Sequence, residues 1–165
     1  MSATVSRPRP AGWLKTLLRG QPHQVIGDGE PPYLLRWFLL PHNKFANVYL
    51  HKFTGSDDPD AFHDHPWPFA SLLLSGSYLE HTPGGRRRRR RGSVAFRKPS
   101  FRHRIEIPTD DAGRAVACRT LVVTGPKVPR WGFWCPRTRS EERFIPWHEF
   151  GDGACAEFTD PRGLP

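Results

Sequence analysis

The sequence predicts an all-β fold in a single domain with one short helix near the N-terminus, and three observations support this. Short runs rich in aromatic, leucine and β-branched residues recur from Tyr33 onward. The segments between them contain Pro, Gly, Asn and Asp, which are typical of turns where an antiparallel chain reverses. No long helical periodicity separates the runs, so we expect a sandwich or small barrel rather than a doubly wound sheet.

The individual elements follow from local patterns. Residues 11–19 are expected to form a short amphipathic helix, with Trp13, Leu14, Leu17 and Leu18 on one side. Apolar runs then predict strands over residues 33–40, 47–53, 69–81, 93–97, 102–107 and 120–125. The aromatic segment Arg130–Pro136 is expected either to close one end of the barrel or to form a wall of a pocket.

A chain of 165 residues has room for one domain and one core. We expect an N-terminal tail with the helix (1–30), a β-barrel (31–150) and a C-terminal tail (151–165). No apolar run reaches the roughly 18 residues that a membrane span needs, and the start MSATVSRPRP has no apolar signal-peptide core. The predicted location is therefore the cytoplasm, without membrane contact.

The three cysteines, Cys118, Cys135 and Cys155, are odd in number and widely spaced. No C-x-x-C pair suggests a zinc site or a disulfide framework. All three are therefore expected to be reduced thiols.

The formal net charge of +9 is unevenly distributed along the chain. Consecutive arginines lie between TPGG and GSVAF: Arg86, Arg87, Arg88, Arg89, Arg90 and Arg91. The flanking glycines place this run in a hairpin loop or its flanks. Two interpretations stay open, a solvated loop of repelling charges or a weak electrostatic contact with nucleic-acid phosphates. No helix-turn-helix, zinc-finger or RNA-recognition signature supports the second.

The stretch AFHDHPWPF contains two histidines, His63 and His65, with one residue between them. Side chains two positions apart on a strand share a face, so both imidazoles could bind one metal ion while Asp64 points to the other side. Pro66 keeps His65 extended and cannot donate to a sheet, which places the segment at a strand start, an edge or a bulge. Ordinary strand histidines remain the alternative.

A metal site needs a third ligand, and His103 is the best candidate. It shares a strand face with Ile105 and Ile107, which suggests that it points inward. Three neutral imidazoles on a rigid sheet suit a divalent transition metal with open positions for a substrate.

These histidines resemble part of the two sequence motifs of the cupin superfamily. In the first motif an H-x-H pair precedes a glutamate and a glycine, and His63, His65 and Gly76 fit at the family spacing. In the second motif, Gly92 and His103 fit the glycine and histidine positions. The resemblance covers roughly residues 33 to 148 and implies a double-stranded β-helix, the jelly-roll barrel of that superfamily.

The chain also departs from these motifs. Phe69 stands where the first motif has its glutamate ligand, which leaves three histidines. The second motif's proline, glycine and asparagine are replaced by Lys98, Ser100 and Ile107. Such a site is similar to that of the cysteine dioxygenase-like thiol dioxygenases, whose first motif also contains H-D-H. That resemblance implies Fe(II) held by His63, His65 and His103, with Zn, Ni or Mn as alternatives, together with dioxygen and a small thiol or carboxylate substrate.

Another part of the thiol dioxygenase pattern is missing. The serine-histidine-tyrosine relay would fall near Val116, Cys118 and Thr120, and none of these residues matches it. Cysteine itself is therefore not assigned as the substrate.

Arg36, Tyr49 and His51 are candidate pocket residues. A guanidinium can bind a carboxylate with two hydrogen bonds, so Arg36 could hold an anionic substrate, although a strand arginine that faces solvent is the alternative. Tyr49 and His51 share a strand face and could line the cavity or border it.

Three functional hypotheses follow from these residues. The first is a metal-dependent cupin, a mononuclear non-haem iron dioxygenase that acts on a small substrate. The second is a non-catalytic cupin that binds a small ligand, and the third is a basic cupin associated with nucleic acid through the arginine run. The oligomeric state stays open, with a homodimer as one possibility because cupins often dimerise.

Overall fold

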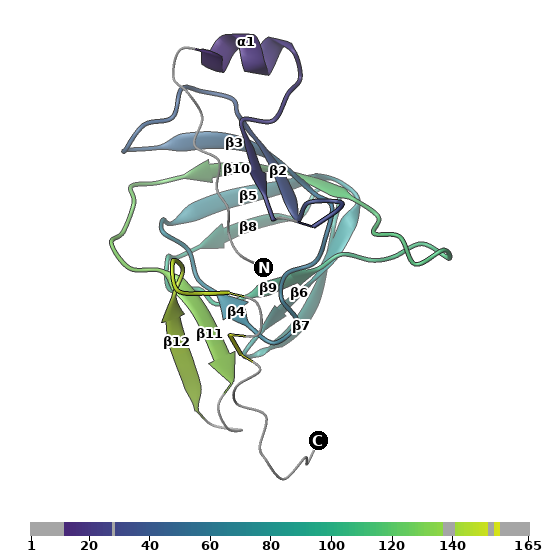
Figure 1. Ribbon diagram of the computed structural model, residues 1–165, viewed down its shortest axis with the longest axis vertical. Helices are drawn as coiled ribbons and strands as arrows, with labels where there is room; N and C mark the ends of the chain where they lie inside the picture. The colour runs from purple at the N-terminus through teal and green to yellow at the C-terminus, as the bar shows by residue number, and fades with distance from the viewer. Residues whose placement is uncertain (1–11, 28, 137–140, 152–153, 156–165) are drawn as a thin grey trace.

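The computed structural model describes residues 12–27, 29–136, 141–151 and 154–155, and strands make up most of its regular structure (Figure 1). One helix, α1 (Trp13–Leu18), precedes the strands. The strands are β1 (Gln24–Ile26), β2 (Leu34–Phe38), β3 (Asn47–Phe53), β4 (Phe62–His63), β5 (Phe69–Ser75), β6 (Ser77–Thr82), β7 (Gly85–Arg90), β8 (Val94–Arg97), β9 (Arg104–Glu106), β10 (Cys118–Thr124), β11 (Gly132–Pro136) and β12 (Glu142–Pro146). The predicted all-β class with one short helix is confirmed.

The strands form antiparallel sheets that make up two walls. The first wall is a sheet of six strands in the order β1-β2-β3-β10-β5-β8, of which β3, β10, β5 and β8 are seen side by side in Figure 1. The second wall consists of two three-stranded sheets, β7-β6-β9 and β12-β11-β4. An antiparallel bridge between His63 and His103 joins these two sheets into one surface.

The pairing of the strands is nested. Strand β3 pairs with β10, β5 with β8 and β6 with β7, while His63 in β4 bridges to His103 just before β9. The first strand of this set pairs with the last and so on inward, which is the pairing of a jelly roll. The predicted jelly-roll barrel is therefore confirmed, with β1, β2 and the β11–β12 hairpin as additions at the sheet edges.

The barrel interior holds the main hydrophobic core. Its buried members come from both walls: Leu34, Phe53, Leu73, Tyr78, Ile105, Ile107 and Cys118. A neighbouring cluster contains Phe38, Tyr49 and Val122, and Trp13 of α1 packs against it. Strand β3 shows the underlying pattern, because its residues alternate between buried and half-buried along its whole length.

The predicted strand over residues 69–81 is two strands, β5 and β6, and Gly76 separates them. Its φ of +76° lies in the left-handed region, and a Cβ at this position would lie 2.8 Å from the Cβ of Cys118. Only glycine fits both conditions without strain. The chain therefore turns here from the first wall to the second.

The arginine run is a strand rather than a loop, although its side chains other than that of Arg89 are exposed. Residues 85–90 form β7, which pairs along its length with β6, so the run is the flank of a hairpin whose turn lies at residues 83–84. Strand β7 was not predicted because its charged residues show no apolar alternation. Strands β1 and β4 were not predicted because they are very short.

Helix α1 is shorter than predicted, and Trp13 is the residue through which it packs against the barrel. Trp13 donates its indole N–H to the carbonyl oxygen of Phe38 at 2.9 Å, so the helix is fixed to the end of β2. Leu14 and Leu18, predicted on the same side of the helix as Trp13, are 54% and 78% exposed, so the apolar side is only partly covered. Among the described residues, no helical segment meets the requirements for a membrane span.

The cysteines differ from the prediction of reduced thiols. Cys135 in β11 and Cys155 form a disulfide, which ties part of the expected C-terminal tail to the second wall. Cys118 is free and buried, and burial raises the pKa of its thiol to about 12. The cytoplasmic location stays a prediction, and the disulfide weighs against it because such bonds are rare in reducing compartments.

Candidate metal centre

The backbone brings the two histidine segments together. His63 and His103 exchange backbone hydrogen bonds of 2.8 and 3.0 Å, while the N–H of His65 donates to the carbonyl oxygen of Pro99 at 3.0 Å. His65 lies just after β4 rather than on the predicted strand. Its position is nevertheless fixed, because both segments contribute to the same bonded surface.

The three imidazole rings converge as the sequence predicted. The ring centroids of His63, His65 and His103 are 4.8 to 5.0 Å apart. One nitrogen of each ring lies within 4.8 Å of the others, so the group could hold a metal ion. The Nε2 atoms of His65 and His103 are 2.8 Å apart, a hydrogen-bond distance, so a metal ion held here would replace the proton that one of them donates to the other.

Glu80, which the sequence patterns did not predict as a site residue, orients the third histidine. Its Oε1 lies 3.0 Å from Nδ1 of His103. A proton on Nδ1 that is donated to this carboxylate leaves Nε2 free as a metal ligand, which is the usual arrangement around metal-bound histidines. The signal in the sequence was an acid two positions after Tyr78, on the inward face of β6.

Two arginines surround Glu80 from the other side. Arg89 donates Nε–H to Oε2 at 2.9 Å, and Arg97 donates from one terminal nitrogen to both carboxylate oxygens at 2.8 and 2.9 Å. Burial alone would raise the pKa of Glu80, but hydrogen bonds from His103, Arg97 and Arg89 outweigh it and lower the pKa to about 2. Glu80 is therefore a buried carboxylate that is ionised near neutral pH.

The environment keeps the first two histidines neutral. Burial lowers the pKa of His63 to about 4, against the opposing charge of Asp57. Burial also lowers the pKa of His65 well below its ordinary value, and the charges of His103 and His63 add to this effect. Neutral imidazoles carry the lone pair that a metal requires.

The remaining surroundings of the rings are mostly aromatic. Phe69, at the position of the missing glutamate, packs its ring against His65 with centroids 4.6 Å apart. Phe133 of β11 lies near His63, with ring centroids 6.1 Å apart. The predicted plug or pocket wall at Arg130–Pro136 is thus largely an added strand beside β4, and one of its aromatic residues faces the candidate site.

Asp64 points away from the histidines, as its place in the sequence predicted. Its carboxylate accepts the backbone N–H of Gly132 at 2.7 Å and the indole N–H of Trp134 at 3.1 Å. It therefore holds β11 against the loop that carries His65 and takes no part in the metal group.

The pocket candidates Arg36, Tyr49 and His51 lie together on the inner face of the first wall. Arg36 donates Nε–H to Nε2 of His51 at 2.9 Å and lies over the Tyr49 ring at 4.9 Å. Burial, followed by the charge of Arg36, lowers the pKa of His51 well below its ordinary value. The charges of Arg36 and His51 also lower the pKa of His65, so this cluster lies within electrostatic reach of the metal group.

Thr120 completes a row across three strands. Arg36, His51 and Thr120 are paired in register on β2, β3 and β10. Among the described residues, the Thr120 hydroxyl is buried without a hydrogen-bond partner, and no carboxylate pairs with Arg36. The row therefore offers a charged donor and a hydroxyl to a ligand inside the barrel.

Comparisons with known proteins give similarity of fold only. No family model and no curated protein matches the sequence. Among solved structures, the chain is similar to the polyketide cyclase RemF from Streptomyces resistomycificus, at 20% identity over 60% of this chain and 69% of that chain, with a TM-score of 0.49. A cupin-2 domain protein from Shewanella frigidimarina is 12% identical over 56% and 79% of the two chains, with a TM-score of 0.42. A double-stranded β-helix protein from Klebsiella pneumoniae is 18% identical over 61% and 83%, with a TM-score of 0.44.

The strand pairing and the histidine group together define the class of protein. It is a cupin-like jelly roll with a three-histidine group that could hold a metal ion.

Proposed function

We propose that the chain is a mononuclear non-haem iron dioxygenase of the cupin type, acting on a small substrate that carries a carboxylate or a thiol. The observation that carries this proposal is the convergence of His63, His65 and His103, with no carboxylate in the group. Three protein ligands leave coordination positions open. Iron(II) bound there would supply redox chemistry toward dioxygen and a positive charge that attracts an anionic substrate.

The chain's own residues would position the reactants. Glu80 holds His103 in one tautomer and one orientation. Arg36, charged and without a carboxylate partner among the described residues, would bind the substrate carboxylate through its guanidinium. The Thr120 hydroxyl, next to His51 in the same row, offers a further hydrogen bond.

A non-catalytic ligand-binding cupin is the second candidate, and the composition of β10 favours it. Cys118 and Thr120 occupy the inward positions where the thiol dioxygenases have a proton relay. Burial raises the pKa of Cys118 to about 12, so its thiol does not exchange protons near neutral pH. A substrate pocket without a relay is also what a simple binding protein would have.

Metal content tests the site itself. The protein, purified without a histidine tag, should bind about one equivalent of iron, and His63→Ala and His103→Ala should each lose most of it. His81→Ala is the matched control, because His81 pairs with Glu106 and lies outside the metal group. Equal metal in all four proteins would remove the ligand assignment.

Oxygen uptake tests the reaction. Iron(II) is loaded without air, and oxygen is then admitted with cysteine, 3-mercaptopropionate or small carboxylates. We expect substrate-dependent uptake that Arg36→Gln weakens by raising KM while iron content is unchanged. Arg119→Gln, an exposed arginine on β10, is the control. Binding of a substrate without any uptake would favour the non-catalytic candidate.

A further inference from the structure

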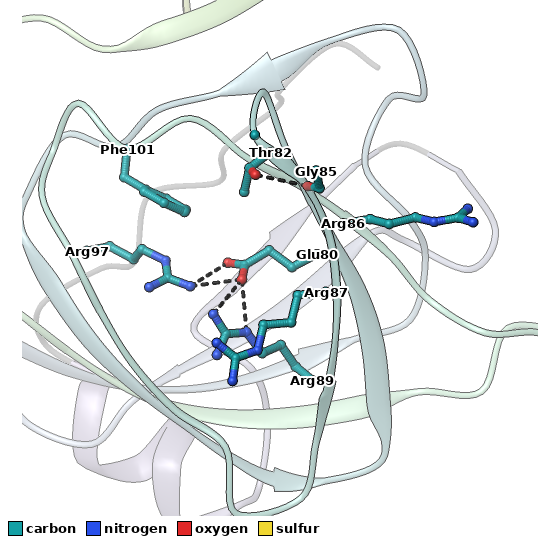
Figure 2. A pocket seen from close by; sticks show the side chains of 9 residues that line it. Glu80, Thr82, Gly85, Arg86, Arg87, Arg89, Arg97 and Phe101 are labelled. Carbon is teal, nitrogen blue, oxygen red and sulfur yellow. Dashed lines mark hydrogen bonds and ion pairs between the residues drawn. The ribbon is translucent and has the colours of Figure 1, made fainter.

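A cavity of about 360 Å³ lies next to the candidate metal centre, and Glu80 contributes to both. Four arginines line this cavity against a single carboxylate. Figure 2 shows Arg89 and Arg97 directed toward Glu80, with Arg87 overlapping Arg89 in this view, with Phe101 beside Arg97 and with Arg86 pointing away. Glu80 is already paired with Arg89 and Arg97. The cavity therefore carries an excess of positive charge.

The alternation of β7 sorts the arginine run into two sets. Arg87 lies directly opposite Glu80 in the β6–β7 pairing, so the two side chains share the inward face. Arg89 shares that face and is buried. Arg88, between them, points to the outer face and is exposed. Arg87 is itself exposed, so the inward set runs from a solvent-exposed guanidinium to the buried one of Arg89.

Two of the inward guanidiniums are held rigidly. Arg97 donates to both oxygens of Glu80, and its guanidinium lies 4.2 Å from the centre of the Phe101 ring. Arg89 is fixed by its own hydrogen bond to Glu80. Side chains that are already ordered lose little conformational entropy when they bind a ligand.

Donors in this cavity lack acceptors. Within the described part of the chain, the Nε–H of Arg97 is buried without a partner. The guanidinium of Arg87 likewise has no hydrogen bond or ion pair there, although it lies two positions from Arg89 on the same face. Glu80 offsets one of the four positive charges in the cavity, so an excess of positive charge stays there.

We propose that this cavity binds the oxyanion of a small molecule, and that a phosphate group is the chemistry that fits it. A phosphate carries up to two negative charges and several acceptor oxygens, which match guanidinium donors arriving from two strands. Nucleic acid fits less well, because Arg89 is buried and the exposed Arg88 and Arg90 do not line the cavity. The proposal is independent of the iron chemistry.

Calorimetric titration with inorganic phosphate at constant ionic strength tests the proposal. Phosphate should bind, and acetate at the same concentration should bind much more weakly. Arg87→Gln should weaken phosphate binding about tenfold, since it removes a charge-assisted donor. Arg88→Gln is the matched control, because it removes the same charge from the neighbouring position of the same strand. It should change binding less than twofold, and both variants should keep the wild-type metal content.

Three results would overturn the proposal. One is the absence of phosphate binding to the wild-type protein. Another is equal weakening by Arg87→Gln and Arg88→Gln, which would mean that only net charge matters. The third is tighter binding of a single-stranded RNA oligonucleotide than of phosphate, lost equally in both variants and steeply salt-dependent, which would assign the run to nucleic acid.

Discussion

At the scale of single residues, Glu80 connects the two candidate sites. Its Oε1 accepts from His103 and Arg97, and its Oε2 accepts from Arg89 and Arg97. Two arginine side chains and one metal-ligand orientation therefore depend on a single negative charge.

Glu80→Gln should harm both stability and metal binding. The variant leaves Arg89 and Arg97 largely buried without a counter-charge, which should lower the free energy of unfolding by about 3 kcal/mol. Metal affinity should fall about tenfold or more, because His103 loses its ionised acceptor. Urea unfolding and titration with a competing chelator measure these effects. Glu106→Gln, which breaks only the pair with His81, should cost less than about 1 kcal/mol.

The histidines make the stability of the metal-free protein depend on pH. The pKa of His63 is about 4 in the folded protein and about 6.5 in an unfolded chain. Between these values the unfolded chain binds more protons, so the free energy of unfolding should rise from pH 4 to pH 6.5, by about 3 kcal/mol from this residue. Below pH 4 and above pH 6.5 this contribution no longer changes.

Urea unfolding in the presence of a chelator at several pH values measures this slope. His63→Gln should reduce the slope near pH 5 by about one proton. His148→Gln is the control, because that side chain is 61% exposed. An unchanged slope in His63→Gln would show that the imidazole is not depressed in the folded protein.

At the scale of elements, Gly76 lets β5 and β6 belong to different walls. Gly76→Ala should lower the free energy of unfolding by about 3 kcal/mol, because the new Cβ would sit on a left-handed backbone and would clash with Cys118. Gly113→Ala is the control, since Gly113 also has a positive φ but nothing within 4 Å of a new Cβ. It should cost only about 1 kcal/mol. Thermal and urea unfolding distinguish the two.

Strands with a clear apolar alternation were predictable from the sequence. The predicted strand at 47–53 has the observed bounds of β3, and 93–97 and 120–125 differ from β8 and β10 by one or two residues at their ends. The strands that were missed lack this signal. Strand β7 consists of one glycine followed by arginines. Strand β4 has only two residues, which form a strand through long-range pairing with β11.

The histidines were predictable, but their supporting residues were not. Spacing on strands gave His63, His65 and His103, because alternation determines which side chains share a face. Arg89 meets Glu80 within the β6–β7 hairpin, but Arg97 of β8 belongs to the other wall and reaches Glu80 only when the barrel closes. Charged residues are also expected on the surface, so burial of this group could not be inferred from composition.

At the scale of the whole molecule, the Cys135–Cys155 disulfide attaches a segment that follows the last strand. It closes a loop with a sequence separation of 20, and its loss should lower the free energy of unfolding by about 3 kcal/mol. Cys155→Ser should therefore melt at a lower temperature than the oxidised protein. Adding reductant should lower the melting temperature of the wild-type protein to a similar value and leave the variant unchanged.

The homodimer stays a prediction, and the outer face of the six-stranded sheet is where we place it. Val94, Phe96, Leu74 and Val123 are 39 to 77% exposed on three adjacent strands. Burial of these apolar side chains would stabilise a contact between two copies, although the exposed Arg119 of β10 lies on the same face as Val123. Phe96→Ser should shift sedimentation toward the monomer, whereas Phe45→Ser, an exposed residue outside that sheet, should not.

The uniform composition of β7 has a consequence for how its hairpin is specified. A slip of one residue normally exchanges the inward and outward side chains of a strand, but here an arginine would still face Glu80 after such a slip. The arginine side chains alone therefore do not determine the register between β6 and β7. The register must be set at the two ends of the run. At one end, Thr82 donates its hydroxyl to the carbonyl oxygen of Gly85 at 2.9 Å, and at the other, Gly92 has a positive φ. Insertion of one more arginine would therefore preserve the chemistry of the cavity while moving the turn.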